Sequence, residues 1–100
     1  MATTDIQLDE KIKIKISEPK RWKVILLNDD TTPMEFVIAL LIEVFRHTQS
    51  TAKDIMLQIH ETGSGIAGTY SFEIAEAKAV EATNTARTNG HQLQIKLEEE

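Results

Sequence analysis

The sequence predicts an α+β fold, with three helices packed against a three-stranded antiparallel sheet in the order β-α-α-β-α-β. Short runs of branched and aromatic residues, 4–8 long, are typical of strands, and three longer stretches show helical periodicity. Capping residues, prolines and glycines separate these runs, so the element order can be followed along the chain. A chain of 100 residues supports one hydrophobic core. We therefore expect a single α+β domain.

The first strand and the first helix surround a polar turn. Residues 22–27 are rich in aromatic and branched apolar side chains, which predicts a strand. Side chains alternate along a strand, so Leu26 and Asn28 should share one face. Residues 33–47 are predicted to be helical, with Thr32 as the N-cap and Pro33 in the first turn. Apolar residues cover nearly the whole circumference of this helix, so it should be the core helix.

A second helix is predicted over residues 51–61, with Ser50 as its N-cap and Gly63 at its end. Its apolar residues follow the i, i+3, i+4, i+7 spacing and form a narrow stripe. His60 lies four residues after Met56, so the imidazole should border that stripe.

The rest of the chain predicts a strand, a helix and a last strand. Residues 66–70 should form a short strand, and residues 72–88 a helix capped by Ser71. The alanines of this helix form a small-residue face that allows close packing: Ala75, Ala79, Ala82 and Ala86. Asn89 and Gly90 should end it. Residues 91–97 alternate in polarity and read as a strand.

Residues 1–20 are predicted to be a flexible arm that precedes the core domain over residues 21–100. Ile12, Ile14 and Ile16 alternate with lysines, so a strand is the alternative for part of this segment. We favour the arm because Pro19 follows and few apolar residues precede it.

Composition narrows the function classes. The net charge is −5, which disfavours binding to nucleic acid or to an anionic membrane surface. There is no cysteine, so a thiolate metal site or nucleophile is impossible. We see no apolar segment typical of a signal peptide or a membrane span, and we expect a cytoplasmic protein.

No motif predicts an enzyme, a metal site or a cofactor. Residues 63–68 match G-x-G-x-x-G, but a helix precedes this string and a strand follows it, the reverse of a dinucleotide site. His47, His60 and His91 lack metal-ligand spacing. We interpret His47 as a partner of a helix C-terminus and His91 as a surface residue. Asp29 and Asp30 are adjacent, so they should point apart rather than share a proton.

A binding pocket is the remaining functional hypothesis. Leu26 and Asn28 point one way from the first strand, and Met34 and Val37 share a face of the core helix. Met56, Ile59 and His60 share an edge of the second helix. If these faces meet, they form an apolar pocket with amide, carboxylate and imidazole acceptors at its rim. An ordinary core beside a polar turn fits the pattern equally well.

Several ordered motifs resemble the ClpS family, the adaptors that carry N-degron substrates to the Clp protease. Residues 22–37 read Trp-Lys-Val-Ile-Leu-Leu-Asn-Asp-Asp-Thr-Thr-Pro-Met-Glu-Phe-Val, which is close to the family signature. Ile55-Met56-Leu57 before Ile59-His60, and Glu73-Ile74-Ala75-Glu76 before Lys78, also match. The resemblance covers residues 21 to 98. It implies a non-enzymatic bacterial adaptor that needs no cofactor.

The resemblance also implies roles for individual residues. Asn28, Asp30 and His60 would bind the free α-amino group of a substrate's first residue. The pocket for its Leu, Phe, Tyr or Trp side chain would consist of Leu26, Thr32, Met34, Val37, Met56, Ile59 and Leu93. Met34 would stand at the wall that excludes Ile and Val. Glu73 and Lys78 would contact the N-terminal domain of a ClpA-type AAA+ unfoldase, and the adaptor would act as a monomer.

Two departures from the family pattern leave the ligand preference open. Thr31 stands where the family often has an aromatic residue, and Ile59 stands where valine is common. The alternative is a divergent paralogue that binds the unfoldase and modulates its substrate choice with an altered N-degron preference.

Overall fold

The computed structural model describes residues 20–100. The predicted arm over residues 1–20 lies outside these residues, apart from Lys20. The elements are β1 (Arg21–Leu27), α2 (Met34–Glu43), α3 (Gln49–Thr62), β2 (Ser64–Ser71), α4 (Phe72–Thr88) and β3 (Gln94–Glu99). This order confirms the predicted α+β fold.

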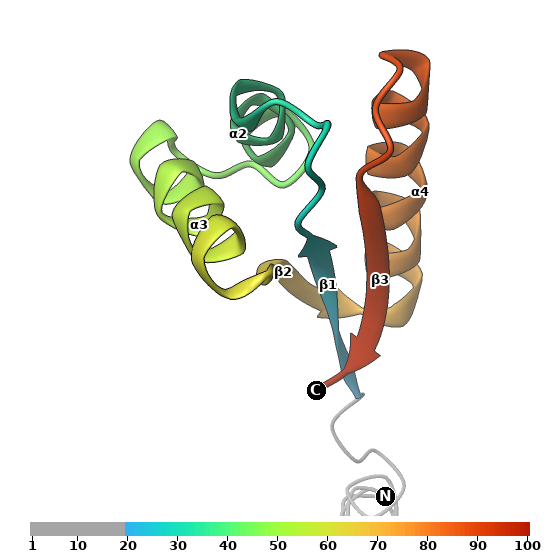
Figure 1. The fold of residues 1–100 in the computed structure, drawn as a ribbon. Helices are drawn as coiled ribbons and strands as arrows, with labels where there is room; N and C mark the ends of the chain where they lie inside the picture. Colours follow the sequence, from blue (N-terminus) through green and yellow to red (C-terminus); the bar gives the residue numbers. More distant parts are fainter. Residues whose placement is uncertain (1–19) are drawn as a thin grey trace, which may run out of the picture.

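The sheet has the strand order β2-β1-β3, and both pairs are antiparallel (Figure 1). The register between β1 and β2 shifts between Val24 and Ile25, where Ala67 is the extra residue of β2. Such a bulge bends the strand and increases its twist. Because β1 lies between β2 and β3, it is the central strand. The C-terminal end of β1 points toward the helices α2 and α3 (Figure 1).

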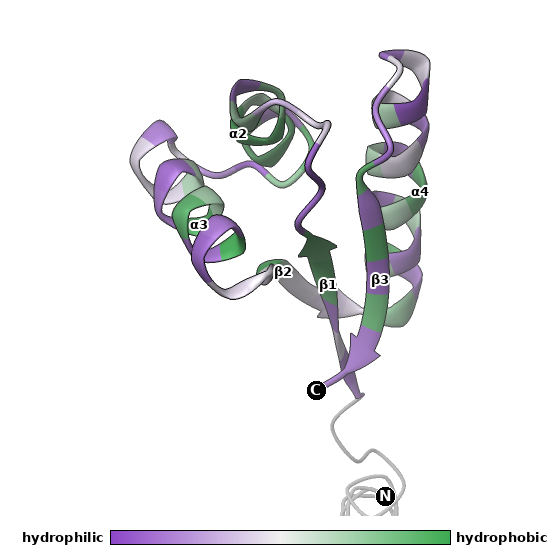
Figure 2. Cartoon of the chain, viewed as in Figure 1, coloured by the Kyte–Doolittle hydropathy of each residue, from purple (hydrophilic) through white to green (hydrophobic). Residues whose placement is uncertain are grey.

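Helix α4 covers one face of the sheet and contacts all three strands. Ala75, Ala82 and Ala86 are completely buried, which confirms the predicted small-residue face of this helix. Near its start, the rings of Trp22 and Phe72 meet edge to face at 5.0 Å between centroids. β3 alternates between apolar and polar residues, as the bands of colour in Figure 2 show. One face of β3 therefore packs on α4.

Helices α2 and α3 pack against each other beside the sheet, and α3 also contacts β2. Figure 2 shows α2 as the most uniformly hydrophobic helix. Val37, Leu40 and Leu41 of this helix are buried in the same core as Leu26. Full burial of an aliphatic side chain stabilises the fold by about 1.5–3 kcal/mol, so this cluster anchors α2 to the core.

The predicted end of the core helix was wrong. Helix α2 ends at Glu43, before His47, because Arg46 adopts a left-handed conformation with φ 63°. The His47 N–H donates to the Leu41 carbonyl at 3.1 Å, so the chain folds back onto the last turn of the helix instead of continuing it. His47 therefore does not lie in the last helical turn, and its Nε2 hydrogen-bonds the Ala67 carbonyl of β2 instead.

Several predicted caps and ends also differ. Pro33, not Thr32, occupies the N-cap position of α2, and the Thr32 hydroxyl donates to Asp29. Thr48, not Ser50, caps α3, and its Oγ1 accepts from the Thr51 N–H at 3.2 Å. Ser71 occupies the N-cap of α4 without a side-chain hydrogen bond. β2 starts at Ser64 and β3 at Gln94, so both strand starts were misplaced by a few residues.

No helix within residues 20–100 is long and apolar enough to cross a membrane.

Candidate functional site

The end of β1 is tied to the end of α3 by a backbone hydrogen bond. Gly63 adopts the left-handed conformation with φ 93° and ends α3, and its N–H donates to the Ile59 carbonyl at 2.9 Å. The Asn28 N–H donates to the Gly63 carbonyl, also at 2.9 Å. His60 lies in the last turn of α3, three residues before Gly63. This connection brings the Asn28 amide and the His60 imidazole to the same region.

The polar turn after β1 is organised by the Asp29 carboxylate. Its Oδ2 accepts hydrogen bonds from the Thr32 hydroxyl at 2.6 Å, the Thr31 hydroxyl at 2.7 Å and the Thr31 N–H at 3.2 Å. Aspartate commonly stabilises turns in this way by binding the backbone two residues ahead. The hydrogen bonds from Thr32 and then Thr31 hold the pKa of Asp29 below its ordinary value. Asp29 therefore fixes the geometry of its neighbours Asn28 and Asp30.

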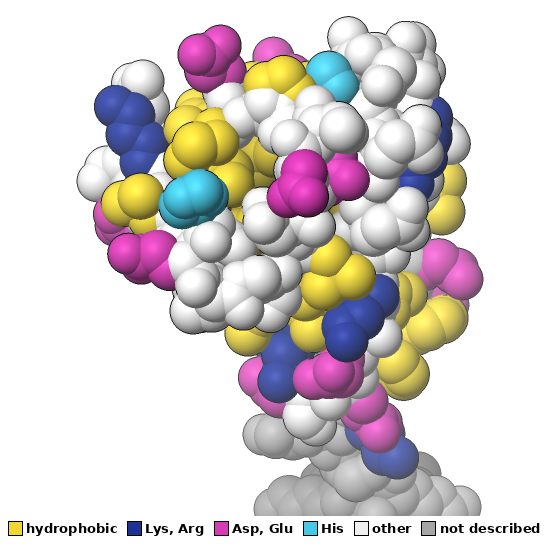
Figure 3. Space-filling model, viewed as in Figure 1, with side chains coloured by type: hydrophobic (Ala, Val, Ile, Leu, Met, Phe, Trp, Pro, Cys, Tyr) yellow, Lys and Arg dark blue, Asp and Glu magenta, His cyan; other side chains and the backbone are white. Residues whose placement is uncertain are grey.

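These side chains line a cavity of about 210 Å³ where the β1–α2 turn meets α3. The residues that line it are Asn28, Asp29, Asp30, Thr32, Met34, Met56 and His60. Figure 3 shows hydrophobic surface between a histidine and acidic side chains in this part of the molecule. The cavity thus combines hydrogen-bond acceptors with the apolar side chains of two methionines.

The structure brings together six of the predicted site residues: Asn28, Asp30, Thr32, Met34, Met56 and His60. Four predicted pocket residues do not line the cavity. These are Leu26, Val37, Ile59 and Leu93, with exposed fractions of 0%, 2%, 1% and 1%. They belong to the same buried cluster as Met56. Asp29, which the family resemblance does not include among the site residues, also lines the cavity.

The two predicted unfoldase contacts lie on different sides of α4. Glu73 is exposed in the first turn of this helix. Lys78 is half-buried, and its Nζ donates to the Val44 carbonyl at 2.8 Å and lies 5.6 Å from the centre of the Tyr70 ring. Each residue turns an α-helix by about 100°, so the side chains of Glu73 and Lys78, five residues apart, point about 140° away from each other. Because the Lys78 ammonium donates to the Val44 carbonyl, it is already engaged inside the protein.

Within residues 20–100, no cluster of three histidine or acidic side chains has a geometry that could hold a metal ion.

Comparison with known proteins identifies a family. A sequence model described as "ATP-dependent Clp protease adaptor protein ClpS" matches residues 17–96. The ATP-dependent Clp protease adapter protein ClpS of Bdellovibrio bacteriovorus is 48% identical over 86 residues, which cover 86% of this chain and 75% of the relative. The protein of the same name from Campylobacter jejuni is 49% identical over 86 residues, with 86% and 90% covered.

A solved structure shows the same architecture. Agrobacterium tumefaciens ClpS2 bound to L-phenylalaninamide matches with a TM-score of 0.80 and 42% sequence identity. The match covers 83% of this chain and 100% of that chain.

Proposed function

The chain belongs to the ClpS family of ATP-dependent Clp protease adaptor proteins, and from this premise we propose that it is an N-degron adaptor. It would bind substrates whose first residue is Leu, Phe, Tyr or Trp and deliver them to a ClpA-type AAA+ unfoldase in the cytoplasm. The observation that carries the proposal is the cavity that joins Asn28, Asp30 and His60 to the methionines. The role is binding rather than catalysis.

The polar side of the cavity suits an α-ammonium group. An ammonium has three N–H donors, and an amide oxygen, a carboxylate and a neutral imidazole nitrogen supply three acceptors. Hydrogen bonds between charged partners are about twice as strong as neutral ones. Asn28, Asp30 and His60 would therefore select a free N-terminus and reject an acetylated one.

The apolar side suits one large side chain. Cavities for drug-sized ligands measure about 300–1,000 Å³, so about 210 Å³ is appropriate for a single residue. Thr32, Met34 and Met56 would line its entrance, and the buried Leu26, Val37, Ile59 and Leu93 would form the layer beneath. Burial of a Leu or Phe side chain contributes about 1.5–3 kcal/mol. L-phenylalaninamide, present in the related structure, carries a free α-amino group and a large aromatic side chain.

A role at the unfoldase interface is proposed for Glu73 and Lys78. Glu73 is exposed and would touch the partner directly. Lys78 would act by holding α4 against the end of α2 through the Val44 carbonyl. The adaptor would act as a monomer.

The decisive experiment is fluorescence anisotropy with labelled peptides that begin with Leu or Phe, free or N-acetylated. Each hydrogen bond to a charged group contributes about 1.5–3 kcal/mol, so acetylation should weaken binding at least about tenfold. Leu57→Ala, a change at an exposed residue that does not line the cavity, is the control and should bind as the parent does. Equal affinity for free and acetylated peptides would refute the adaptor proposal.

A second candidate is a divergent paralogue that modulates the unfoldase with an altered N-degron preference. The observation that favours it is the hydrogen bond that the Thr31 hydroxyl donates to the Asp29 carboxylate at 2.7 Å, beside the cavity. A peptide panel that begins with Leu, Phe, Tyr, Trp, Ile or Val tests it. Preference for Ile or Val over the four large residues would favour the paralogue.

A further inference from the structure

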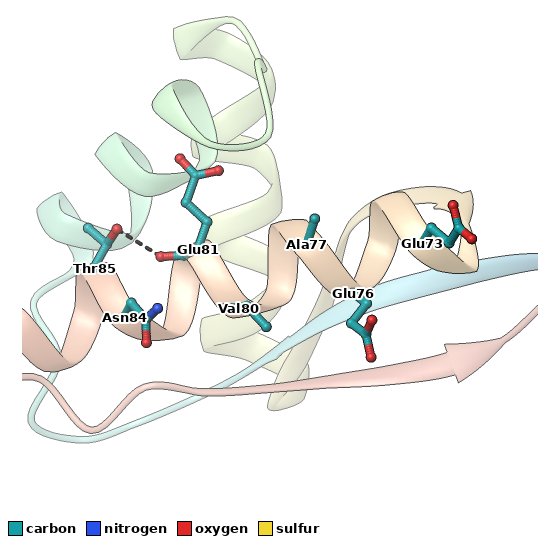
Figure 4. A pocket seen from close by; sticks show the side chains of 7 residues that line it. All are labelled: Glu73, Glu76, Ala77, Val80, Glu81, Asn84 and Thr85. Carbon is teal, nitrogen blue, oxygen red and sulfur yellow. Dashed lines mark hydrogen bonds between the residues drawn. The ribbon is translucent and has the colours of Figure 1, made fainter.

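The outer surface of α4 carries an apolar groove bordered by carboxylates. Figure 4 shows its lining, in which Ala77 and Val80 lie between Glu73, Glu76 and Glu81, and its volume is about 580 Å³. A second hollow of about 280 Å³ adjoins it between α4 and β3, where Leu97 contributes. Both hollows share Glu76, Val80 and Asn84, so we treat them as one surface, the α4–β3 groove.

The groove is apolar at its centre and acidic at its border. Val80 is 52% exposed and lies in both hollows. Within residues 20–100, the ion pairs involve Glu98, Glu99 and Glu100, and none involves Glu73, Glu76 or Glu81. The groove therefore suits an apolar segment that carries several positive charges.

We propose that residues 11–16 of the chain itself occupy the α4–β3 groove. They read Lys-Ile-Lys-Ile-Lys-Ile and contain three cations and no acid. In an extended segment the three isoleucines share one side. Those side chains cover Val80 and Leu97, and the long lysine side chains reach the carboxylates at the border.

The length of the connecting chain fits this placement. Arg21 pairs with Ser71, so the chain enters β1 beside the first residue of α4. From Phe72 to Val80 the helix rises about 12 Å, at about 1.5 Å per residue. The eight residues 13–20 span up to about 26–29 Å when extended. The chain can therefore reverse its direction before β1 and still bring Ile12 and Ile14 to Val80.

A segment attached to the same chain competes well against a separate molecule. A short tether gives an effective concentration of the order of millimolar, so even weak contacts produce docking. The docked segment would cover Glu73 and reduce its access to the unfoldase. This consequence alone rests on the proposed function.

Paramagnetic NMR on the full chain tests the docking. The chain has no cysteine, so Gln7→Cys provides one site for a nitroxide label. We expect the label to broaden the amide signals of residues 80–88 selectively. Val80→Lys replaces the apolar centre with a repelling cation and should abolish this selectivity, as should Ile14→Ser. If Val80→Lys fails to fold, Ile14→Ser alone decides the outcome.

Leu57→Lys is the matched control, because Leu57 is 51% exposed on α3 and lies in neither hollow. It should leave the broadening unchanged. Uniform broadening over the whole surface, or selective broadening that survives Ile14→Ser, would overturn the proposal. Broadening of an isotope-labelled chain by a spin-labelled second copy would also overturn it, because the occupant would then be another molecule. Failure of docking would leave the acetylation result unaffected.

Discussion

Gly65 approaches the α3 side chain Ile59 so closely that a single methyl group should strain the fold. A Cβ at position 65 would lie 2.7 Å from Cγ1 of Ile59 and 3.4 Å from the Ile55 carbonyl oxygen. Ile59 is only 1% exposed, so it cannot move outward to relieve the contact. Gly65→Ala should therefore force core side chains to shift.

The expected magnitude follows from two opposing effects. Overpacking a core costs about 1–3 kcal/mol. Alanine in place of glycine in a strand recovers about 0.5–1 kcal/mol. The net loss should be about 0.5–2 kcal/mol in the parent chain. In an Ile59→Ala background the contacting Cγ1 is absent, so Gly65→Ala should be neutral or stabilising by about 0.5–1 kcal/mol.

Urea unfolding of the parent, both single variants and the double variant measures this coupling. Ile59→Ala alone should cost about 2–5 kcal/mol, which a domain with about 5–15 kcal/mol of stability can tolerate. Gly90→Ala is the control, because Gly90 has φ 79° and no atom within 4 Å of its virtual Cβ. Its cost of about 1–2 kcal/mol should be the same in both backgrounds. If Gly65→Ala also costs the same in both, the contact with Ile59 does not limit the fold.

Three further predictions concern the cavity. Met34→Ala should weaken binding of Leu peptides by about 1 kcal/mol, or about fivefold, through lost apolar contact and improve binding of Ile and Val peptides, as read by anisotropy. His60→Ala removes one acceptor for the ammonium and should weaken binding of peptides with a free N-terminus at least about tenfold, as read by anisotropy. Asp29→Asn should lower stability to urea at neutral pH. The pKa of Asp29 lies below 3.8, so its contribution is complete above that pH and is lost as pH falls through the folded-state value.

Each of these predictions has a contradicting result. Unchanged exclusion of Ile and Val in Met34→Ala would show that another residue forms the wall. Unchanged affinity of His60→Ala for free peptides would show that the imidazole does not bind the α-amino group. An acid limb of unfolding that is identical in Asp29→Asn and the parent would show that the hydrogen bonds from Thr31 and Thr32 do not stabilise the charged form.

Local patterns predicted the element types well and the element ends poorly. The uniform apolar surface of α2 and the alanine face of α4 are periodic signals, and periodicity reports burial directly. The end of α2 depends on the left-handed Arg46, a residue type that gives no sequence signal for that conformation. Thr32 satisfied the local rule for an N-cap, but Pro33 holds that position and the Thr32 hydroxyl donates to Asp29.

The sequence by itself determined the kinds of groups available to the site: an amide, two carboxylates, an imidazole and apolar side chains near two helices. Their resemblance to one family pointed to roles for Asn28, Asp30 and His60. Only the tertiary structure decided which side chains share the cavity and which are buried beneath it. One contact that brings these side chains together is the hydrogen bond from the Asn28 N–H to the Gly63 carbonyl, which joins segments 35 residues apart. Long-range contacts of this kind arise from packing of the whole core, and no local pattern encodes them.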